Sequence, residues 1–537
     1  MKNKGLLFLL LILVIASFFR LWQLDSIPPG LYPDEAINGN NALEVLRTGN
    51  LKVFYPDNNG REGLFINLVA LSFAVFGASV WSLKIVTAII GILTVLGLYL
   101  LTKELFSHLA IKPFNHSAIA LLASFFLAIS FWHTNFSRIG FRGILVPFVL
   151  VFGLYFLMKA FRTKKLSNFI FSGIFWGIGF YTYISFRMAV IIIIIILILK
   201  FIEYLKKERS EIGWGRILWK KIYLRDGWWK VNVFLVVIIL IALPIGIYFL
   251  QNPGDFIGRA TGVSIFSQQS PVMAFGESLV KHLGMFNFYG DPNWRHNFAG
   301  SPMLFWPIGI LFLIGIVLSI RHLIQSIKTK NYPLFTVYCL LFIWFFAMLL
   351  PGVLTYEGVP HALRVIGVIP VVYIFAAIGG LVIYGWLKNI IKKPKLLFVL
   401  CLLFIVFTGY SEFNKYFYNW AKNSEVEKAF SKNYVTIGNY LNSLPSKIKK
   451  YVIVNEPGVP LYGISIPAQT VIFIEAAKFN QPRSIYVKAE DLNKIETDQK
   501  ETIIVPLYDG KLFDELRKKF PQGKVIETNS FYLYRIE

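Results

Sequence analysis

The stretch SLKIVTAIIGILTVLGLYLL (82–101) carries a single charged side chain, Lys84, in a largely apolar run. A helix needs about 20 apolar residues to cross the roughly 30 Å hydrocarbon core of a bilayer, so this stretch predicts a membrane-spanning helix. Similar runs recur along the chain. Together they predict about eleven spanning helices, at residues 5–23, 82–101, 117–134, 145–161, 169–184, 188–204, 232–250, 303–319, 334–351, 364–386 and 396–411.

The composition indicates the same class of fold. Of the 537 residues, 56% are hydrophobic and 17% are aromatic. A soluble protein of this length would not need repeated apolar runs long enough to cross a bilayer. The two cysteines, Cys339 and Cys401, lie inside apolar runs and predict no disulfide framework. The sequence therefore indicates a polytopic α-helical membrane protein.

The net charge of +24 could suggest a nucleic-acid partner, but its distribution favours a membrane topology. The basic residues gather in short segments between apolar runs, as cytoplasmic loops do under the positive-inside rule. We therefore expect no nucleic-acid partner, and expect contacts with anionic membrane lipids. The clusters are Lys2/Lys4, Arg162/Lys164/Lys165, Lys206 to Lys230, Arg321/Lys328/Lys330 and Lys388/Lys392/Lys393/Lys395.

The topology depends on how the segment 61–77 is interpreted. It is apolar but short, and we expect it to lie at the membrane interface as a helix. If it crossed the bilayer instead, the basic cluster between Lys206 and Lys230 would fall outside the cell, against the positive-inside rule. The N-terminal run has no small-residue cleavage site and predicts an uncleaved first helix. The expected location is a prokaryotic cytoplasmic membrane, with the N-terminus inside.

Two domains are expected, and the second begins where the composition changes. Residues 1–411 form the membrane domain, whose first external loop spans 24–80. Residues 412–537 alternate a helical pattern at 424–444 with short strand-like runs, which predicts a small α/β domain outside the membrane. The strand-like runs are YVIVN (451–455), TVIFIEA (470–476), TIIVPLY (502–508) and SFYLYRI (530–536).

An acidic pair, Asp34 and Glu35, opens a predicted helix in the first external loop. Acids in the first turn of a helix stabilise its dipole and cap free N–H groups, and that interpretation remains open. Helical spacing also places Asn38 on the polar face of Asp34, which capping does not require. A carboxylate near the hydrocarbon edge is partly desolvated, which raises its basicity and suits a general base.

Several arginines are candidates for binding a phosphate. Arg138 and Arg142 are four residues apart, and we expect them to project from one side of a helix end. Arg364 opens an apolar helix, and Arg61 precedes the interfacial one. Each could instead extend to lipid phosphates at the surface. Together they could hold an anionic lipid headgroup.

The stretch GDPNWRHNFAG (290–300) reads as a turn, because it is rich in Pro, Asn and Gly. It also offers an acid, a stacking ring, a cation and amides, which suit a sugar or an acceptor, and His361 could contribute as well. No H-x-x-x-H or C-x-x-C spacing occurs, so a metal site has weak support. We expect no cofactor, although a divalent metal is not excluded. The candidate residues in this stretch are Asp291, Trp294, Arg295, His296 and Asn297.

A base and several cations near lipid headgroups favour group transfer from a lipid phosphate. The base activates the acceptor hydroxyl and the cations stabilise the departing phosphate. A two-carboxylate hydrolase would need its acids separated across a cleft, which adjacent residues do not supply. Two other classes remain: a transporter or flippase of a lipid-linked sugar, and an interaction module on an inactive membrane anchor. The transporter should carry broken helices near the midplane, and the middle helices here are almost uninterrupted.

The chain resembles the GT-C membrane glycosyltransferases, in the branch of protein O-mannosyltransferases and aminoarabinose lipid A transferases. The resemblance covers roughly residues 1–410, and the block through residue 106 is its most specific part. Two positions depart from the pattern of that branch: Arg142 and Gly143 replace an acid, and Arg61-Glu62-Gly63 replaces Lys-Pro-Pro. The motifs that carry it are PDEAINGNNALEVLRTGN (33–50), the block 63–106, FSRIGFRG (136–143) and PHALRVIGVIP (360–370).

The resemblance implies an inverting glycosyltransferase that uses a polyprenyl-phosphate sugar as donor. It implies that Asp34 is the catalytic base, that Glu35 is its neighbouring acid, and that Arg138 contacts phosphate. The expected reaction moves a hexose to a hydroxyl of a protein, lipid or glycan acceptor on the outer face of the membrane.

Overall fold

The computed structural model describes residues 2–107, 116–212, 228–461, 463–497, 501–508, 511–528 and 530–537. The chain divides into two compact units. The predicted basic cluster between Lys206 and Lys230 falls largely on residues 213–227, outside the described residues. The first unit contains Met1–Trp22, Ala88–Ser137 and Arg142–Tyr416, and the second contains Gln23–Thr87, Arg138–Phe141 and Phe417–Glu537.

The described part of the chain contains eight helical segments that are long and apolar enough to cross a membrane. Four shorter apolar helices accompany them, in α1 (Lys2–Leu21), α3 (Leu64–Phe76), α5 (His116–Ile129) and α8 (Leu166–Gly179). Eight of the eleven predicted spanning runs fall in the long segments and three fall in the shorter helices α1, α5 and α8. Helix α3 is the one expected at the interface. The polytopic helical fold is therefore confirmed. The eight segments are α4 (Val80–Phe106), Arg142–Thr163 with α7 (Leu145–Thr163), Ile184–Lys206 within η2 (Ile184–Ala189) and α9 (Val190–Ile212), α11 (Trp229–Gln251), α14 (Trp306–Lys328), α15 (Tyr332–Val353), Ile366–Ile390 with α16 (Ile369–Ile390), and Pro394–Trp420 with α17 (Pro394–Asn414).

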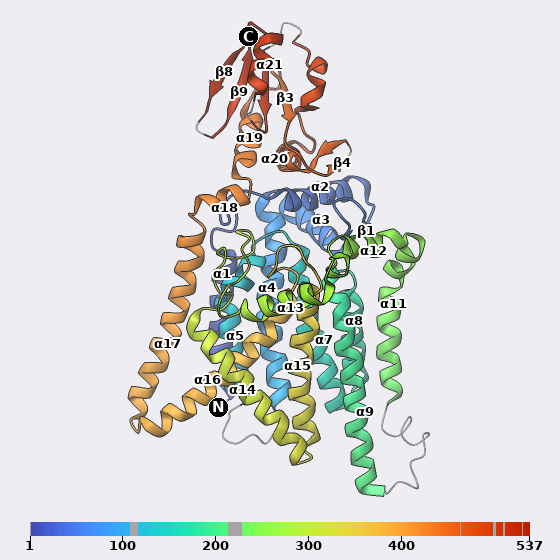
Figure 1. The fold of residues 1–537 in the computed structure, drawn as a ribbon, viewed down its shortest axis with the longest axis vertical. Helices are drawn as coiled ribbons and strands as arrows, with labels where there is room; N and C mark the ends of the chain where they lie inside the picture. Colours follow the sequence, from blue (N-terminus) through green and yellow to red (C-terminus); the bar gives the residue numbers. More distant parts are fainter. Residues whose placement is uncertain are drawn as a thin grey trace. The chain divides into compact units, whose positions relative to one another are not determined.

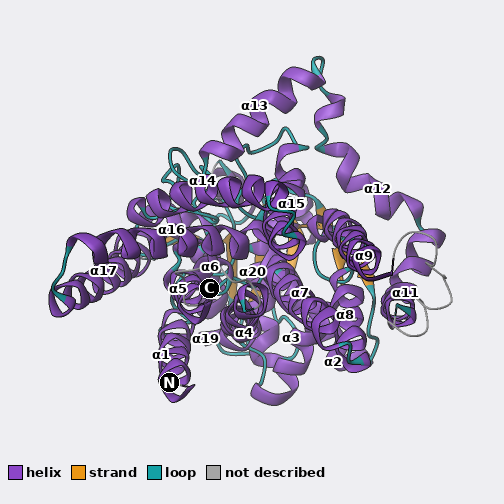
Figure 2. Cartoon of the chain, turned by 90° about the horizontal axis from the view of Figure 1, so that it is seen from below, coloured by secondary structure: helices purple, strands orange, loops and turns teal. Residues whose placement is uncertain are grey.

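Helices α5, α14 and α16 pack side by side in the first unit, as Figure 2 shows. Two glycines let α14 and α16 approach closely. A Cβ on Gly315 would collide with the backbone carbonyl of Phe375, and one on Gly379 would collide with that of Leu311. Small residues at a helix interface gain packing contacts that hydrocarbon alone does not favour. Helix α8 packs in the same unit between α7 and α11.

The predicted helix 117–134 is interrupted, which corrects one expectation. Helix α5 ends at Ile129, and α6 (Phe131–Phe136) starts anew. Ser130 caps α6, because its Oγ accepts a hydrogen bond from the backbone N–H of His133 at 3.2 Å. The chain then turns after residue 136. Arg138 and Arg142 therefore do not share one helix end as expected, and they belong to different compact units.

The second unit combines the first loop of the chain with its C-terminal domain. The loop contains α2 (Pro33–Thr48), a hairpin of β1 (Phe54–Tyr55) and β2 (Arg61–Glu62), and α3. The Oγ1 of Thr470 donates to the carbonyl of Leu31 at 3.0 Å, and Asn40 donates to the side chain of Gln469 at 2.9 Å. The boundary between the units near the end of α17 lies at residues 416/417, and the predicted domain boundary is at 411/412.

The C-terminal domain is built on a five-stranded mixed sheet of order β6-β3-β7-β9-β8. Figure 1 labels three of its strands, β3, β8 and β9. Strand β3 is parallel to β6 and β7, whereas β9 is antiparallel to β7 and β8. Alternate residues of β3 enter two cores, one with α19 and one with α21. The predicted α/β class is confirmed. The elements are α18 (Ser424–Ala429), α19 (Lys432–Ser443), β3 (Lys449–Val454), β6 (Ile485–Lys488), β7 (Thr502–Pro506), α21 (Leu512–Lys519), β8 (Lys524–Glu527) and β9 (Tyr532–Ile536).

The strand predicted at 470–476 is wrong, because those residues lie in helix α20 (Gln469–Phe479). A short apolar run is compatible with either a buried strand or a buried helix. Here the run is buried on several sides: Phe473 packs on Gly39 and stacks on Phe73 with ring centroids 6.0 Å apart. Asn480, with a φ of 62°, ends the helix in the left-handed conformation.

Candidate functional site

The acidic pair opens α2, and its two carboxylates have different surroundings. Pro33 occupies the first turn of the helix, where its missing N–H costs nothing. Glu35 is fully buried, and its Oε1 accepts a hydrogen bond from the backbone N–H of Tyr32 at 3.3 Å. Its Oε2 accepts one from the backbone N–H of Gly140 at 2.5 Å. Glu35 therefore caps the helix and fixes the segment 138–141 to it.

Burial raises the pKa of the Glu35 carboxyl above its ordinary value of 4.5. The positive charge of Lys84 and the backbone N–H groups of Gly140 and Tyr32 oppose this rise, and the charge of Asp34 adds to it. Its two backbone hydrogen bonds make Glu35 a structural carboxylate that holds the start of α2 and the segment 138–141 together.

Asp34 is partly exposed and much less constrained. Its Oδ1 accepts a hydrogen bond from the side-chain amide of Asn58 at 2.8 Å, and Asn58 lies in the turn of the β1–β2 hairpin. Among the described residues, the other oxygen of the carboxylate has no hydrogen-bond donor. A carboxylate held at one oxygen and open at the other can accept a proton from a bound hydroxyl group.

Arg61, on β2, joins the hairpin to α2. Its two terminal nitrogens donate to the amide oxygens of Asn38 at 2.9 Å and Asn41 at 2.8 Å. The amide nitrogen of Asn38 in turn donates to the carbonyl of Gly140 at 3.0 Å. Asn38 and Arg61 were both predicted as site residues, and the structure brings them together with Glu35. The network fixes the helix that carries Asp34.

Arg138 is fully buried and binds backbone carbonyl groups of the segment before α2. Its guanidinium donates to the carbonyl of Gln23 at 3.0 Å and to that of Ile27 at 2.9 Å, and it lies 5.1 Å from the ring centroid of Phe417. These contacts explain why a charge is tolerated at this depth, since buried arginines need several hydrogen-bond acceptors.

Lys84 is also fully buried, and no motif marked it as a site residue. Its Nζ donates to the carbonyl groups of Pro28 and Gly30, both at 3.3 Å. It also exerts a positive charge on Glu35. The signal in the sequence was its place as the one charged residue in the run 82–101.

The turn 290–300 folds on Asp291 in the first unit. The Oδ1 of Asp291 accepts the backbone N–H of Asn293 at 2.8 Å, and Asn297 donates to the carbonyl of Ser301 at 2.6 Å. His296 is buried, and its Nδ1 lies 3.0 Å from the Oδ2 of Asp291. The predicted turn geometry is present, and Asn297 serves it. Of the other predicted residues, Trp294 packs on Phe298 and Arg295 is partly exposed.

The loop before α16 contributes to the same cluster. The Nδ1 of His361 lies 4.0 Å from the Oδ2 of Asp291, and the backbone N–H of Ala362 donates to that oxygen at 2.7 Å. Arg364 donates to the Oγ1 of Thr355 at 2.8 Å and pairs with Glu357 at 3.2 Å. The structure therefore brings Asp291, His296 and His361 together.

His282, on α13 (Pro271–Gly284), supports the cluster from behind. Its Nδ1 faces the carbonyl of Ser278 at 2.8 Å, and its Nε2 accepts the backbone N–H of His361 at 3.3 Å. Burial lowers the pKa of His282 to about 4, so the ring is neutral at physiological pH.

Arg142, another predicted phosphate-binding residue, lies in η1 (Arg142–Ile144) and is partly exposed. Its guanidinium lies 5.3 Å from the ring centroid of Tyr183.

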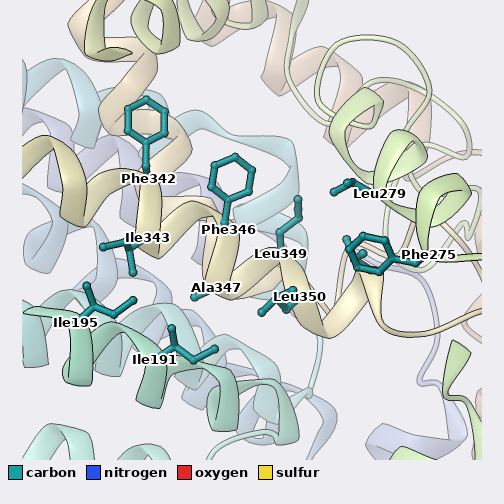
Figure 3. A pocket seen from close by; sticks show the side chains of 11 residues that line it. Ile191, Ile195, Phe275, Leu279, Phe342, Ile343, Phe346, Ala347, Leu349 and Leu350 are labelled. Atoms are coloured by element: carbon teal, nitrogen blue, oxygen red, sulfur yellow. The ribbon is translucent and has the colours of Figure 1, made fainter. Parts of the chain in front are cut away.

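A cavity of about 430 Å³ opens in the first unit between α9, α13 and α15. Figure 3 shows side chains of the three helices around it, among them Ile191, Phe275 and Phe346. All eleven lining residues are hydrocarbon in character. An apolar cavity of this kind fits a lipid or prenyl chain, because it offers no hydrogen-bond partner to a polar molecule.

A second cavity, of about 340 Å³, lies in the second unit between α2 and α20. It is polar in part: Asn40, Asn41, Glu44, Arg47 and Gln469 contribute to its lining. Hydroxyl-bearing or amide-bearing molecules can find hydrogen-bond partners there. The cavity of the first unit is thus lined only by hydrocarbon side chains, and that of the second unit by polar and apolar ones.

Comparison with known proteins finds a family profile that matches part of the chain and solved structures with a similar fold. A family profile described as dolichyl-phosphate-mannose-protein mannosyltransferase matches residues 64–209. No curated protein matches the chain by sequence. The structure of ArnT from Cupriavidus metallidurans bound to undecaprenyl phosphate superposes with a TM-score of 0.55, at 13% identity, covering 100% of this chain and 98% of that one. The oligosaccharyltransferase of Archaeoglobus fulgidus tethered to an acceptor peptide has a TM-score of 0.50, at 14% identity, covering 88% of this chain and 63% of that one.

These similarities bear out the predicted resemblance to the GT-C membrane glycosyltransferases. The profile match is confined to residues 64–209, and the similarity to the two solved structures is one of fold. The apolar helices identify it as a multi-pass membrane protein.

Proposed function

We propose that this membrane protein is a GT-C glycosyltransferase that moves a hexose from a polyprenyl-phosphate donor to a hydroxyl acceptor, with inversion at the anomeric carbon. The acceptor would lie on the outer face of the membrane, on the side that carries the first loop and the C-terminal domain. The observation that carries the proposal is the carboxylate of Asp34, held at one oxygen by Asn58 and open at the other.

In the proposed reaction, Asp34 removes the proton of the acceptor hydroxyl as its oxygen attacks the anomeric carbon. The bond between that carbon and the phosphate oxygen breaks, and polyprenyl phosphate leaves with the electron pair. Phosphate is a good leaving group, so no general acid is needed. Because attack and departure occur on opposite faces of the sugar, the configuration inverts.

The other predicted residues would bind or position the reactants. Arg142 and Arg364, both partly exposed, are proposed to hold the donor phosphate. Arg61 and Arg138 donate to oxygens of the chain itself, so they position the base and its loop. The apolar cavity of the first unit is proposed to take part of the prenyl chain, which is supported by the undecaprenyl phosphate bound to the ArnT structure.

The test is Asp34→Asn in the purified, full-length protein. A radiolabelled polyprenyl-phosphate hexose serves as donor, and membranes from cells that lack the gene supply the acceptor. Loss of a general base should reduce transfer by about 10²–10⁴-fold, while donor binding and thermal stability stay near those of the wild type. Glu425→Gln, in α18 of the same unit, is the matched control and should transfer normally, since Glu425 forms an exposed ion pair with Lys428. Equal transfer by Asp34→Asn and wild type would refute the assignment of the base.

The same assay separates the enzyme from the transporter and anchor classes. A flippase would move the labelled lipid across a vesicle membrane without forming a new glycoside. Mass spectrometry of surface glycoconjugates with and without the gene would then identify the acceptor.

A further inference from the structure

Three metal-binding side chains converge in the first unit, although no metal motif occurs in the sequence. Asp291, His296 and His361 each offer one ligand atom, and these atoms lie within 4.8 Å of one another. Asp291 and His296 come from the turn 290–300, and His361 comes from the loop before α16. Within the part of the chain that the structure describes, no other trio of His, Cys, Asp or Glu side chains is brought together in this way.

The spacing of the three atoms is close to that of a metal site. The Nδ1 of His296 lies 3.0 Å from the Oδ2 of Asp291, and the Nδ1 of His361 lies 4.0 Å from it. Zinc binds nitrogen and oxygen at about 2.0–2.2 Å, which places tetrahedral ligand atoms roughly 3.4 Å apart. The observed pairs lie on either side of that value, so an ion needs only small side-chain adjustments.

Hydrogen bonds from the surrounding chain hold the three side chains in place. One of them, from the backbone N–H of Arg364 to the Nδ1 of His361 at 3.4 Å, is long, and a bound ion would replace it. The backbone N–H groups of Asn293 and Ala362 each bind one oxygen of Asp291, which fixes the carboxylate plane. The Nε2 of His282 accepts the backbone N–H of His361. Supporting hydrogen bonds of this kind orient ligands in metalloproteins.

Exposure leaves the cluster open on one side. The side chains of Asp291 and His296 are 2% and 5% exposed, but that of His361 is 17% exposed. An ion held by three protein ligands would therefore keep one coordination position accessible. Two imidazoles and one carboxylate match the donors that Zn²⁺ and similar first-row ions accept.

We infer that Asp291, His296 and His361 bind one divalent transition-metal ion, with Zn²⁺ the best match, which ties the turn 290–300 to the loop that carries Arg364. The alternative on the same geometry is a metal-free hydrogen bond from His296 to Asp291. The inference is independent of the transfer reaction, because it concerns metal content and the stability of the first unit.

The test measures metal in the untagged, full-length protein, purified in detergent from zinc-supplemented cells. Inductively coupled plasma mass spectrometry should find about one zinc ion per chain. His361→Gln and Asp291→Asn should bind the ion at least tenfold more weakly, since even residues outside the ligand set cost about 10–100-fold. His322→Gln is the matched control and should keep the ion, because His322 stacks on Tyr338 between α14 and α15.

Two measurements on the wild type keep the test valid if a variant fails to fold. Removal of the ion with a chelator should lower the melting temperature, and zinc should restore it. Substitution with Co²⁺ should give the visible absorption of a low-symmetry site. Metal below about a tenth of an ion per chain, or no effect of the chelator, would overturn the inference. Equal metal in His361→Gln and His322→Gln would also overturn it.

Discussion

The α2 cluster consists of Glu35, Asn38, Arg61 and Gly140, and the turn cluster consists of Asp291, His296 and His361. Both bury a carboxylate, but they surround it with different partners. Glu35 accepts backbone N–H groups on both oxygens. Asp291 accepts backbone N–H groups as well, and its Oδ2 also faces two imidazoles. Both acids are almost completely buried.

The difference shows that the partner determines what a buried carboxylate can do. Backbone N–H donors at fixed positions make Glu35 a rigid link, and they leave its neighbour Asp34 open for chemistry. Imidazoles can exchange a proton for a metal ion, so the Asp291 cluster can bind a ligand. Variants in one cluster should therefore leave the measured property of the other unchanged, and the predictions below test that independence.

Glu35→Ala should have the largest effect on stability. It leaves the N–H groups of Tyr32 and Gly140 without their acceptors, and an unsatisfied buried donor costs about 1–3 kcal/mol. We expect a loss of about 3 kcal/mol, measured as a fall in the thermal unfolding temperature in detergent. Glu425→Ala, at an exposed ion pair with Lys428, should cost less than about 1 kcal/mol. Similar losses for both variants, or a loss of bound zinc in Glu35→Ala, would contradict the comparison.

Gly140→Ala should come next, because it adds a methyl group where the α2 cluster has no room. The new Cβ would meet the side chain of Leu83 and lie 3.2 Å from the Oε2 of Glu35. Overpacking of this kind costs about 1–3 kcal/mol. Gly409→Ala, in α17 where no atom lies within 4 Å, should be neutral or slightly stabilising. The prediction fails if the two variants melt at the same temperature.

Sequence patterns predicted the spanning helices and the α/β domain because both depend on local periodicity. The prediction of a strand at 470–476 failed, because a run of seven apolar residues does not reveal whether it is buried on one side or on several. Phe473 reaches Gly39 and Phe73, which are hundreds of residues away in the chain. Local pattern contains no information about such partners.

The candidate site shows the same limit. The pair Asp34 and Glu35 stood out, but two adjacent acids could not be assigned separate tasks until Gly140 and Asn58 were placed beside them. The cluster of Asp291, His296 and His361 could not be recognised as a sequence motif, because His361 lies on a different loop from the other two residues. Lys84 was visible as a lone charge, but its carbonyl partners were not.

The pH dependence of stability should separate Glu35 from an ordinary surface acid. Its folded pKa is raised above 4.5 by burial, so the native state binds the proton more tightly than the unfolded chain does. Its contribution to stability is therefore present below pH 4.5 and is lost as the pH rises through the folded pKa. Within that window the free energy of unfolding should fall by up to about 1.4 kcal/mol for each pH unit. Glu35→Gln should remove this slope, and an unchanged slope would contradict the assignment.

Asn58→Gly should have the smallest effect, and it tests the side-chain hydrogen bond that Asp34 makes among the described residues. Asn58 has a φ of 52°, a conformation that glycine adopts without strain, so the backbone of the hairpin turn should persist. The variant removes the amide that fixes Oδ1 of Asp34 at 2.8 Å. A lost hydrogen bond to a charged group in the reacting geometry, worth about 1.4 kcal/mol, lowers a rate about tenfold. We expect kcat to fall by about that factor while melting temperature and zinc content stay unchanged. If Asn58→Gly lowered the melting temperature as much as Glu35→Ala does, Asn58 would be part of the rigid scaffold, and the distinction between the two acids would be lost.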